Sequence, residues 1–289
     1  MPGVPASESP GIPAMLAAID FIEANLKEEI AVADVAEAVS YSLFHFCRMF
    51  NRIVQHTPYD YLIRRRLAES ARVLVESEYK IADVAFDFRF HSAETYSRAF
   101  KRVFGMQPFQ WKQQGFIDRR ALMPRLTSAH LEHINRAEIA RPKLVIQPAI
   151  CLAGMMTQVK GERVRLSGLW EMLEEELRNS ESTPVGYYGV AFYPSGWQEH
   201  GCLYLAGAQV DAERASHSAL VTKTIPAGRY AQFSHAGSYQ AVALTLDYIY
   251  HTWLPKSGEC LSGTYEIEIY GEANGAVRTL SPQYILMPI

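Results

Sequence analysis

The sequence IADVAFDFRFHSAETYSRAFKRVFGMQP, residues 81–108, decides the fold of the N-terminal half because its pattern occurs twice. An earlier copy, VADVAEAVSYSLFHFCRMFNRIVQHTP, occupies residues 32–58. Ala33 and Ala82 stand 49 residues apart, whereas Pro58 and Pro108 stand 50 apart. The difference is one inserted residue, and insertions are tolerated in turns between helices. The repeat therefore predicts two copies of one small helical motif.

Each copy carries the signals of two helices joined by a turn. Its first eight residues have apolar side chains at i, i+3, i+4 and i+7, which form one face of a helix. Ser42 and Ser92 follow, and serine is a preferred N-cap residue for the next helix. Pro58 and Pro108 each open a further helix, since proline fits the first helical turn. Each copy is predicted to be a helix-turn-helix motif.

The second helix of each copy is amphipathic. The residues expected on its buried face are Leu43, Phe46 and Phe50 in the first copy, and Tyr96, Ala99 and Phe100 in the second. Those expected on its exposed face are Phe44, Cys47, Arg48 and Asn51, and Glu94, Thr95, Arg98 and Lys101. Arg48 and Arg98 occupy equivalent positions, and arginine is the commonest reader of guanine O6 and N7 in the major groove.

A run of three arginines, Arg64, Arg65 and Arg66, lies between the two copies. Such a run can contact phosphates, which position a protein on DNA. The alternative is that these arginines only solvate a helix face, as most charge runs do. The segment from Ser42 to Arg120 holds 14 Lys and Arg against 8 Asp and Glu, although the whole chain has a net charge of −3. The registered repeats around the arginines favour DNA binding over a purely structural role.

Residues 12–115 resemble the DNA-binding domain of the AraC family of bacterial transcription regulators, most closely members that carry this domain first. The resemblance rests on IADVA (81–85), YSRAFKRVFGMQP (96–108) and RRRLAESARVL (64–74). It implies two readers in successive major-groove segments. The base-facing residues that it implies are Phe44, Cys47, Arg48, Ala93, Glu94, Thr95, Ser97 and Arg98. The family usually has glycine where this chain has Ser40, Gln55 and Arg89, so those turns are expected to differ slightly.

The C-terminal half changes to a pattern rich in β-strands. Strands are predicted over 203–210, 230–234 and 265–270, and helices over 163–179 and 238–254. The dipeptide Pro-Ala precedes a strand at position 148 and again at position 226. The half therefore reads as an α+β domain of two βαββ units. The expected organisation is a loose tail over 1–11, a DNA-binding domain over 12–120, a linker over 121–141 and an effector-binding domain over 142–289.

Residues 142–289 resemble the gyrase-inhibitor-like effector-binding domain. The segments that carry the resemblance are FSHAGSYQAV (233–242), WLPKSG (253–258), EIY (268–270) and LMPI (286–289). The resemblance implies two βαββ units related by a pseudo-twofold axis, with a ligand groove between them. Glu268 matches the glutamate of the family's E-x-Y strand.

A ligand groove of this kind would combine a carboxylate with aromatic side chains. The candidate ligand-binding residues are Trp170, Tyr188, Tyr193, Trp197, Tyr204, Glu268, Tyr270 and Tyr284. Aromatic faces and a buried carboxylate suit a lipophilic cation through cation–π and charge interactions. Glu266 faces the same side as Glu268 by the two-residue period of a strand, which leaves the choice between them open. Tyr284 stands where the family often has glutamate, so a cationic ligand is only slightly favoured over a neutral one.

The cysteines and the terminus bound the compartment and the cofactors. Cys47, Cys151, Cys202 and Cys260 lie far apart without a C-x-x-C motif, so neither a metal site nor a disulfide framework is expected. The N-terminus has no basic start followed by an apolar run, as a signal peptide would. The sequence thus predicts a cytoplasmic protein without a cofactor.

These patterns together predict a ligand-responsive, sequence-specific transcription regulator rather than an enzyme. Duplex DNA and a small aromatic or lipophilic effector are the expected partners. One alternative makes the C-terminal domain a small-molecule hydrolase, although no nucleophile–base pair is visible. Another makes it a protein-interaction module that binds RNA polymerase or another protein.

Overall fold

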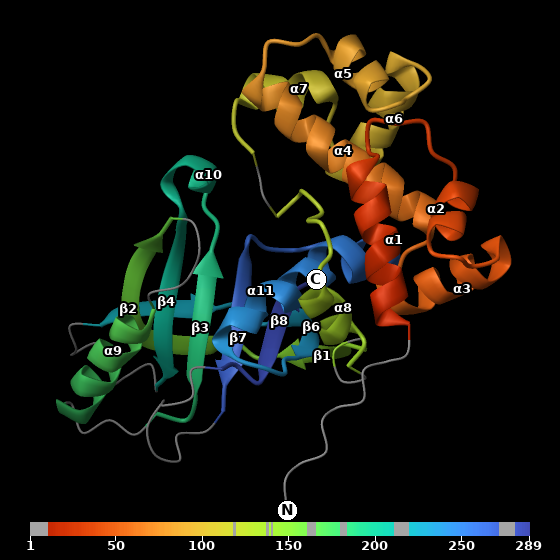
Figure 1. Cartoon of the computed structure of the whole chain (residues 1–289). Coiled ribbons are helices and arrows are strands. Elements are labelled where there is room, and N and C mark those ends of the chain that lie inside the picture. Colours follow the sequence, from red (N-terminus) through yellow and green to blue (C-terminus); the bar gives the residue numbers. More distant parts are fainter. Residues whose placement is uncertain are drawn as a thin grey trace, which may run out of the picture. The chain divides into compact units, whose positions relative to one another are not determined.

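The computed structural model describes residues 11–117, 120–136, 139, 141–160, 166–179, 184–210, 220–271 and 281–289. The tail predicted over 1–11 lies outside them except for its last residue. The chain divides into two compact units (Figure 1). The helical unit comprises the chain up to Asn135 together with Leu246–Lys256. The sheet unit comprises Arg136–Thr245 and Ser257–Ile289.

The helical unit contains both predicted helix-turn-helix motifs. Its helices are α1 (Ile12–Ala24), α2 (Val32–Ala38), α3 (Leu43–Val54), α4 (Pro58–Glu76), α5 (Ile81–Asp87), α6 (Ala93–Phe104), α7 (Pro108–Gln114) and α8 (Ser128–Ile134). The pairs α2–α3 and α5–α6 are the two motifs, and proline begins both α4 and α7, as predicted. The Ser92 hydroxyl caps α6 by accepting a hydrogen bond from the backbone N–H of Thr95 at 3.1 Å.

The two motifs bury equivalent aromatic side chains. Phe46 and Phe50 of α3 and Tyr96 and Phe100 of α6 are fully buried, as expected. Leu43 is instead 49% exposed, which contradicts its predicted burial. Leu43 is the first residue of α3, one turn before Phe46, and the buried stripe begins only at that second turn.

Three non-glycine residues end helices or turns in the left-handed conformation. The φ angles are 58° at Ser40, 64° at Gln55 and 62° at Arg89. Ser40 and Arg89 occupy the same position in the two motifs, between the first and second helix. The turns therefore keep a conformation that favours glycine, although none of the three residues is glycine.

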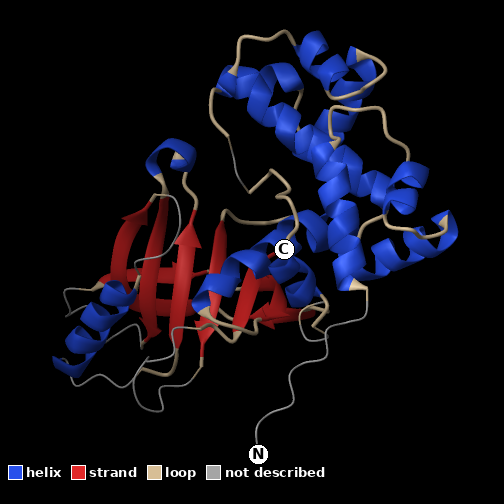
Figure 2. Cartoon of the chain, viewed as in Figure 1, coloured by secondary structure: helices blue, strands red, loops and turns tan. Residues whose placement is uncertain are grey.

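The sheet unit is an eight-stranded antiparallel sheet with helices on one face (Figure 2). Its first half holds β1 (Lys143–Gln147), β2 (Ile150–Val159), α9 (Ser167–Asn179), β3 (Tyr187–Phe192), α10 (Trp197–His200) and β4 (Cys202–Gln209). Its second half holds β5 (Val221–Ile225), β6 (Gly228–Ser234), β7 (Tyr265–Tyr270) and β8 (Tyr284–Pro288). Between β6 and β7 the chain is helical through a 3₁₀ turn (Tyr239–Ala241), α11 (Val242–Tyr248), a π turn (Ile249–Trp253) and α12 (Leu254–Ser257).

The strand order β1-β6-β8-β7-β3-β4-β2-β5 reveals the duplication. The strands β1 to β4 of the first half correspond in turn to β5 to β8 of the second half. Exchanging each strand for its counterpart gives the same order read from the other edge of the sheet. The two βαββ units predicted from the sequence are therefore present, and each has one additional strand before it. These additional strands cross over: β1 pairs with β6 of the other half, and β5 pairs with β2.

The sheet has two different faces, because successive side chains of a strand point to opposite sides. On one face, α9 packs over β2 and β4 and covers Tyr187, Ala191, Tyr204 and Tyr270. We call this the α9 face. The other face carries a separate aliphatic cluster of Leu152, Val190, Leu205, Ile267 and Leu286 among its members. Among the described residues, no helix is both long and apolar enough to cross a membrane.

Candidate functional sites

The exposed sides of α3 and α6 carry the residues predicted to read DNA. Phe44, Arg48, Glu94, Arg98 and Lys101 are exposed. The half-buried members of the predicted set are Cys47, Ala93, Thr95 and Ser97. The Arg48 guanidinium lies 6.0 Å from the ring centre of Phe44, which is 78% exposed. Both helices thus present an arginine at the same position of the motif, with its donors available to a partner.

The arginine run of α4 has a different environment. Arg65 is 4% exposed, and its guanidinium contacts Glu23 at 2.7 Å, Glu69 at 2.7 Å and the Met123 carbonyl oxygen at 2.6 Å. Burial opposes its charge, but the hydrogen bonds and negative charge of Glu23 raise the pKa of Arg65 above its ordinary value. The Arg65 side chain is therefore a structural cation at the centre of the helical unit.

Arg66 is also internal. It is 6% exposed and donates to the carbonyl oxygens of Leu26 at 2.8 Å and Glu28 at 2.6 Å. The structure contradicts the predicted phosphate contacts of Arg65 and Arg66, because their donors serve the fold. Arg64 is closer to the surface, with a side chain 19% exposed and its Nε 2.9 Å from Asp60.

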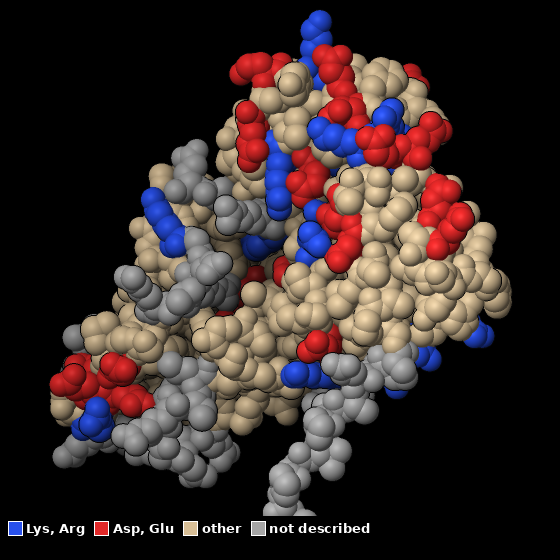
Figure 3. Space-filling model, in the orientation of Figure 1, with Lys and Arg blue, Asp and Glu red and all other residues tan. Residues whose placement is uncertain are grey.

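Charge on the rest of the surface is distributed unevenly. On the face drawn in Figure 3, basic and acidic side chains are interspersed over the helical unit. Acidic side chains gather at the outer side of α9, where Glu171 and Glu175 are exposed. Part of the negative charge of the C-terminal half thus lies on the solvent-exposed side of α9, separate from the buried carboxylates described next.

A buried carboxylate lies on the α9 face of the sheet unit, near the middle of the sheet. Glu268 of β7 is 2% exposed, and its Oε2 accepts hydrogen bonds from the Tyr204 hydroxyl at 2.6 Å and the Tyr270 hydroxyl at 2.7 Å. Burial and the charge of Glu268 raise the pKa values of both tyrosines well above the ordinary value. The two hydroxyls therefore stay protonated and act as donors to the carboxylate.

Gly189 makes room for this arrangement. It lies directly opposite Glu268 in the β3–β7 ladder. A Cβ atom at Gly189 would lie 2.1 Å from the Tyr204 hydroxyl oxygen and 2.6 Å from Glu268 Oε2. Sequence analysis missed this residue, although a glycine inside a strand is a known sign of close approach by another group.

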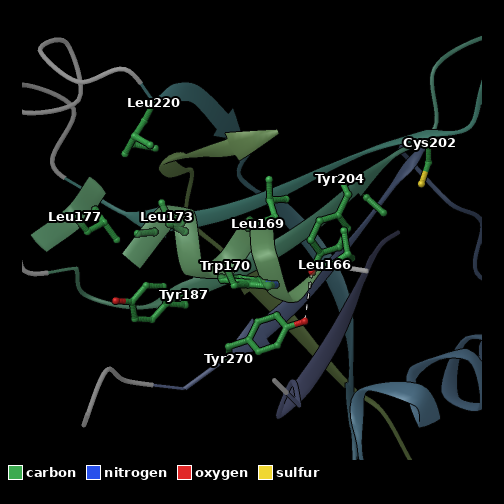
Figure 4. Close-up of a cluster of buried hydrophobic side chains, with 14 of the residues drawn as sticks. Leu166, Leu169, Trp170, Leu173, Leu177, Tyr187, Cys202, Tyr204, Leu220 and Tyr270 are labelled. Atoms are coloured by element: carbon green, nitrogen blue, oxygen red, sulfur yellow. Dashed lines mark hydrogen bonds between the residues drawn. The ribbon is translucent and has the colours of Figure 1, made fainter. Parts of the chain in front are cut away.

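Aromatic rings from α9 and from the strands pack together on this face, among them Trp170, Tyr187, Tyr204 and Tyr270 (Figure 4). The Trp170 ring of α9 lies 4.7 Å from Tyr270 and 6.4 Å from Tyr187, measured between ring centres. Trp170 is 2% exposed, and its indole N–H has no hydrogen-bond partner among the described residues. An unused buried donor is costly, which sets Trp170 apart from the tyrosines of the cluster.

A second carboxylate lies beside the first. Glu266 is 1% exposed and accepts a hydrogen bond from the Tyr193 hydroxyl at 2.9 Å. The Trp197 ring meets the Tyr193 ring edge-on at 5.0 Å. Glu266 and Glu268 thus both lie on the α9 face, and each accepts hydrogen bonds from different tyrosine hydroxyls.

Two of the predicted ligand-binding residues lie on the opposite face. Tyr188 and Tyr284 pack against the aliphatic cluster of Val190 and Ile267. The Tyr188 hydroxyl donates to the Gln209 side chain at 3.1 Å. Their predicted place beside Glu268 is wrong, because Tyr188 alternates with Tyr187, which belongs to the α9 face. The other six predicted residues do lie together on the α9 face: Trp170, Tyr193, Trp197, Tyr204, Glu268 and Tyr270.

The architecture defines a class: a double helix-turn-helix unit joined to a duplicated α+β unit with buried carboxylates. Comparison with known proteins agrees. Residues 35–114 match the family described as a helix-turn-helix domain. Residues 141–284 match the family described as a GyrI-like small molecule binding domain.

The relatives are bacterial proteins. The multiple antibiotic resistance protein MarA of Salmonella typhimurium is 33% identical over 94 residues, which cover 32% of this chain and 74% of MarA. The right origin-binding protein of Escherichia coli is 33% identical over 93 residues, 32% of each chain. The uncharacterized HTH-type transcriptional regulator YbfP of Bacillus subtilis is 34% identical over 110 residues, 38% of this chain and 35% of YbfP.

The chain belongs to the AraC family of transcription regulators and carries a GyrI-like small-molecule-binding domain in its C-terminal half. It spans about a third of the length of YbfP and of the right origin-binding protein. Of the three relatives, YbfP is named as an HTH-type transcriptional regulator.

Proposed function

We propose that the protein is a transcription regulator that binds duplex DNA through α3 and α6 and responds to a small aromatic effector bound beside Glu268. The four cysteines are free thiols, which fits the reducing cytoplasm in which such a regulator would work. The domain boundaries expected near residues 120 and 142 belong to the same proposal.

DNA recognition follows from the exposed faces of the two motifs. In this proposal Arg48 and Arg98 donate to guanine, each from the middle of its helix. Phe44 offers an apolar surface to a thymine methyl group, and Glu94 can accept from the amino group of cytosine. Arg64 is the one member of the arginine run that we retain as a candidate phosphate contact.

The single observation that carries the effector site is the Glu268 carboxylate held by two tyrosine hydroxyls within an aromatic cluster. A cationic ligand would gain from the carboxylate and from the faces of the surrounding rings. Tyr284 packs on the other face of the sheet. The family's glutamate at that position would therefore not belong to the Glu268 cluster, and having tyrosine there does not reduce the negative charge of the cluster. We therefore favour a lipophilic aromatic cation over a neutral aromatic molecule.

The test compares two probes of nearly the same shape. Methyltriphenylphosphonium carries a positive charge, and triphenylphosphine oxide is neutral. Isothermal titration of the full chain should show binding of the cation, and Glu268→Gln should weaken it by about 1–3 kcal/mol, as expected for a charged hydrogen bond. The neutral probe should lose little affinity in the same variant.

Glu266→Gln is the matched control, since Glu266 is equally buried on the same face two residues away. It should change the affinity for the cation less than Glu268→Gln does. Equal affinities of wild type and Glu268→Gln for both probes would show that Glu268 is structural and that the effector binds elsewhere.

A further inference from the structure

The helical unit contains a cavity of about 150 Å³ that the proposed effector site does not use and that shares only Arg64 with the proposed DNA-binding residues. Arg64 of α4 and Phe104 at the end of α6 form one part of its wall. Arg120, from the segment after α7, and Tyr250 and His251, from the π turn, form the rest. A cavity of roughly this volume is large enough to hold a benzene ring.

The polar groups of the cavity wall favour an anion. Arg64 and Arg120 are both cationic, and no Asp or Glu is among the described residues that line the cavity. The Asp60 carboxylate accepts from Arg64 Nε, but a guanidinium has five N–H donors, so others remain for a ligand. The Arg120 guanidinium lies 5.8 Å from the centre of the Tyr250 ring, so charge and aromatic surface occur together.

His251 adds a buried neutral donor. It is 6% exposed and lines the cavity. Burial, assisted by the positive charge of Arg64 and opposed by Asp247, lowers the pKa of His251 to about 4. Its imidazole is neutral at pH 7 and can donate one hydrogen bond to a carboxylate oxygen.

We propose that this cavity binds a small aromatic carboxylate. Arginine binds carboxylates through paired hydrogen bonds, and Phe104 and Tyr250 provide ring surfaces for the aromatic part. An inorganic anion would leave these rings uncovered, and a cation would meet the two guanidinium groups. The site is thus opposite in charge preference to the Glu268 cluster and stands independently of it.

The test uses benzoate and its neutral isostere benzamide on the full chain. Isothermal titration should show benzoate binding at least tenfold more tightly than benzamide. Arg64→Met and Arg120→Met keep an unbranched apolar stem and remove the guanidinium group with its charge, and each should weaken benzoate at least tenfold. Arg125→Met is the control, because Arg125 pairs with Asp20 on the surface and does not line the cavity.

A second variant protects the test against misfolding of the arginine variants. Ala121 lines the cavity, and Ala121→Leu should abolish benzoate binding by filling space while both arginines remain. Glu268→Gln should leave benzoate affinity unchanged, which separates this site from the proposed effector site. Equal binding of benzoate and benzamide, phosphate binding as tight as benzoate, or unchanged benzoate affinity in Ala121→Leu would each overturn the proposal.

Discussion

The arginines of the two reading helices and those of α4 are alike in type but opposite in environment. Arg48 of α3 and Arg98 of α6 are exposed. Arg65 and Arg66 of α4 are 4% and 6% exposed. All four lie in the same basic segment of the chain, so local composition does not distinguish a base reader from a structural cation.

The difference comes from how many sides of each helix are covered. α3 and α6 each bury one apolar stripe and leave the other side to solvent. α4 joins the two motifs and buries residues around most of its circumference, including Leu62, Leu67 and Ser70. An arginine on such a helix has to find acceptors inside the protein, and Glu23 and several carbonyl oxygens provide them.

The largest expected effect follows from this contrast. Arg65→Ala removes the cationic partner of Glu23, whose side chain is 9% exposed, and leaves the charge of that carboxylate uncompensated although the Tyr61 hydroxyl still donates to it. The free energy of unfolding of the helical unit should fall by about 3–5 kcal/mol, measured by urea denaturation. Arg125→Ala is the control, because its ion pair with Asp20 is exposed and should contribute less than about 1 kcal/mol. Equal losses in both variants would refute the structural role of Arg65.

The reading helices should show the reverse behaviour. Arg48→Ala and Arg98→Ala should each weaken binding to a duplex selected from a random library by about 1–3 kcal/mol and relax the preference at one position. Their free energies of unfolding should stay within about 0.5 kcal/mol of wild type, as for other surface substitutions. Specific binding that survives in the double variant would remove α3 and α6 from the interface.

Much of this architecture could be predicted from the sequence, because local signals and the global fold agree. The single inserted residue between the copies, the two serines at N-cap positions and the two prolines located the helices of both motifs. The left-handed residues Ser40, Gln55 and Arg89 were recognisable as positions where related sequences use glycine. Each of these features is visible in a short stretch of sequence, in the repetition of that stretch or in its resemblance to the family.

The parts that could not be predicted depend on contacts between distant segments. Burial of Arg66 depends on the carbonyl oxygens of Leu26 and Glu28, 40 and 38 residues away. The face occupied by Tyr188 follows from the register of β3 against β4 and β7. Strand β1 pairs with β6, and β5 pairs with β2, so each lies in the half of the sheet formed by the other repeat. The sequence of a single repeat does not indicate this pairing.

A smaller effect should distinguish the two motifs from each other. The Ser92 hydroxyl caps α6 by bonding to the Thr95 N–H, whereas the Ser42 side chain makes no such bond to α3. Ser92→Ala should therefore lower the free energy of unfolding by about 1 kcal/mol. Ser42→Ala should lower it by only a few tenths, and urea denaturation of both variants checks the difference. A Ser42→Ala loss as large as that of Ser92→Ala would contradict the observed caps.

The smallest effect concerns the equivalent turn positions Ser40 and Arg89. Both have positive φ, where a side chain is strained and glycine is not. Ser40→Gly should relieve this strain, partly offset by the greater freedom of glycine in the unfolded chain, for a net gain of about 0.5 kcal/mol. Arg89→Gly should gain nothing, because it also removes the hydrogen bond from Arg89 Nε to the Lys27 carbonyl oxygen at 2.6 Å. Ser40→Ala is the control, since it shortens the side chain and keeps the strain, and its stability should not exceed that of wild type. If Ser40→Gly and Arg89→Gly stabilise the protein equally, the Arg89 contact contributes nothing and the two turns are equivalent in energy as well as in position.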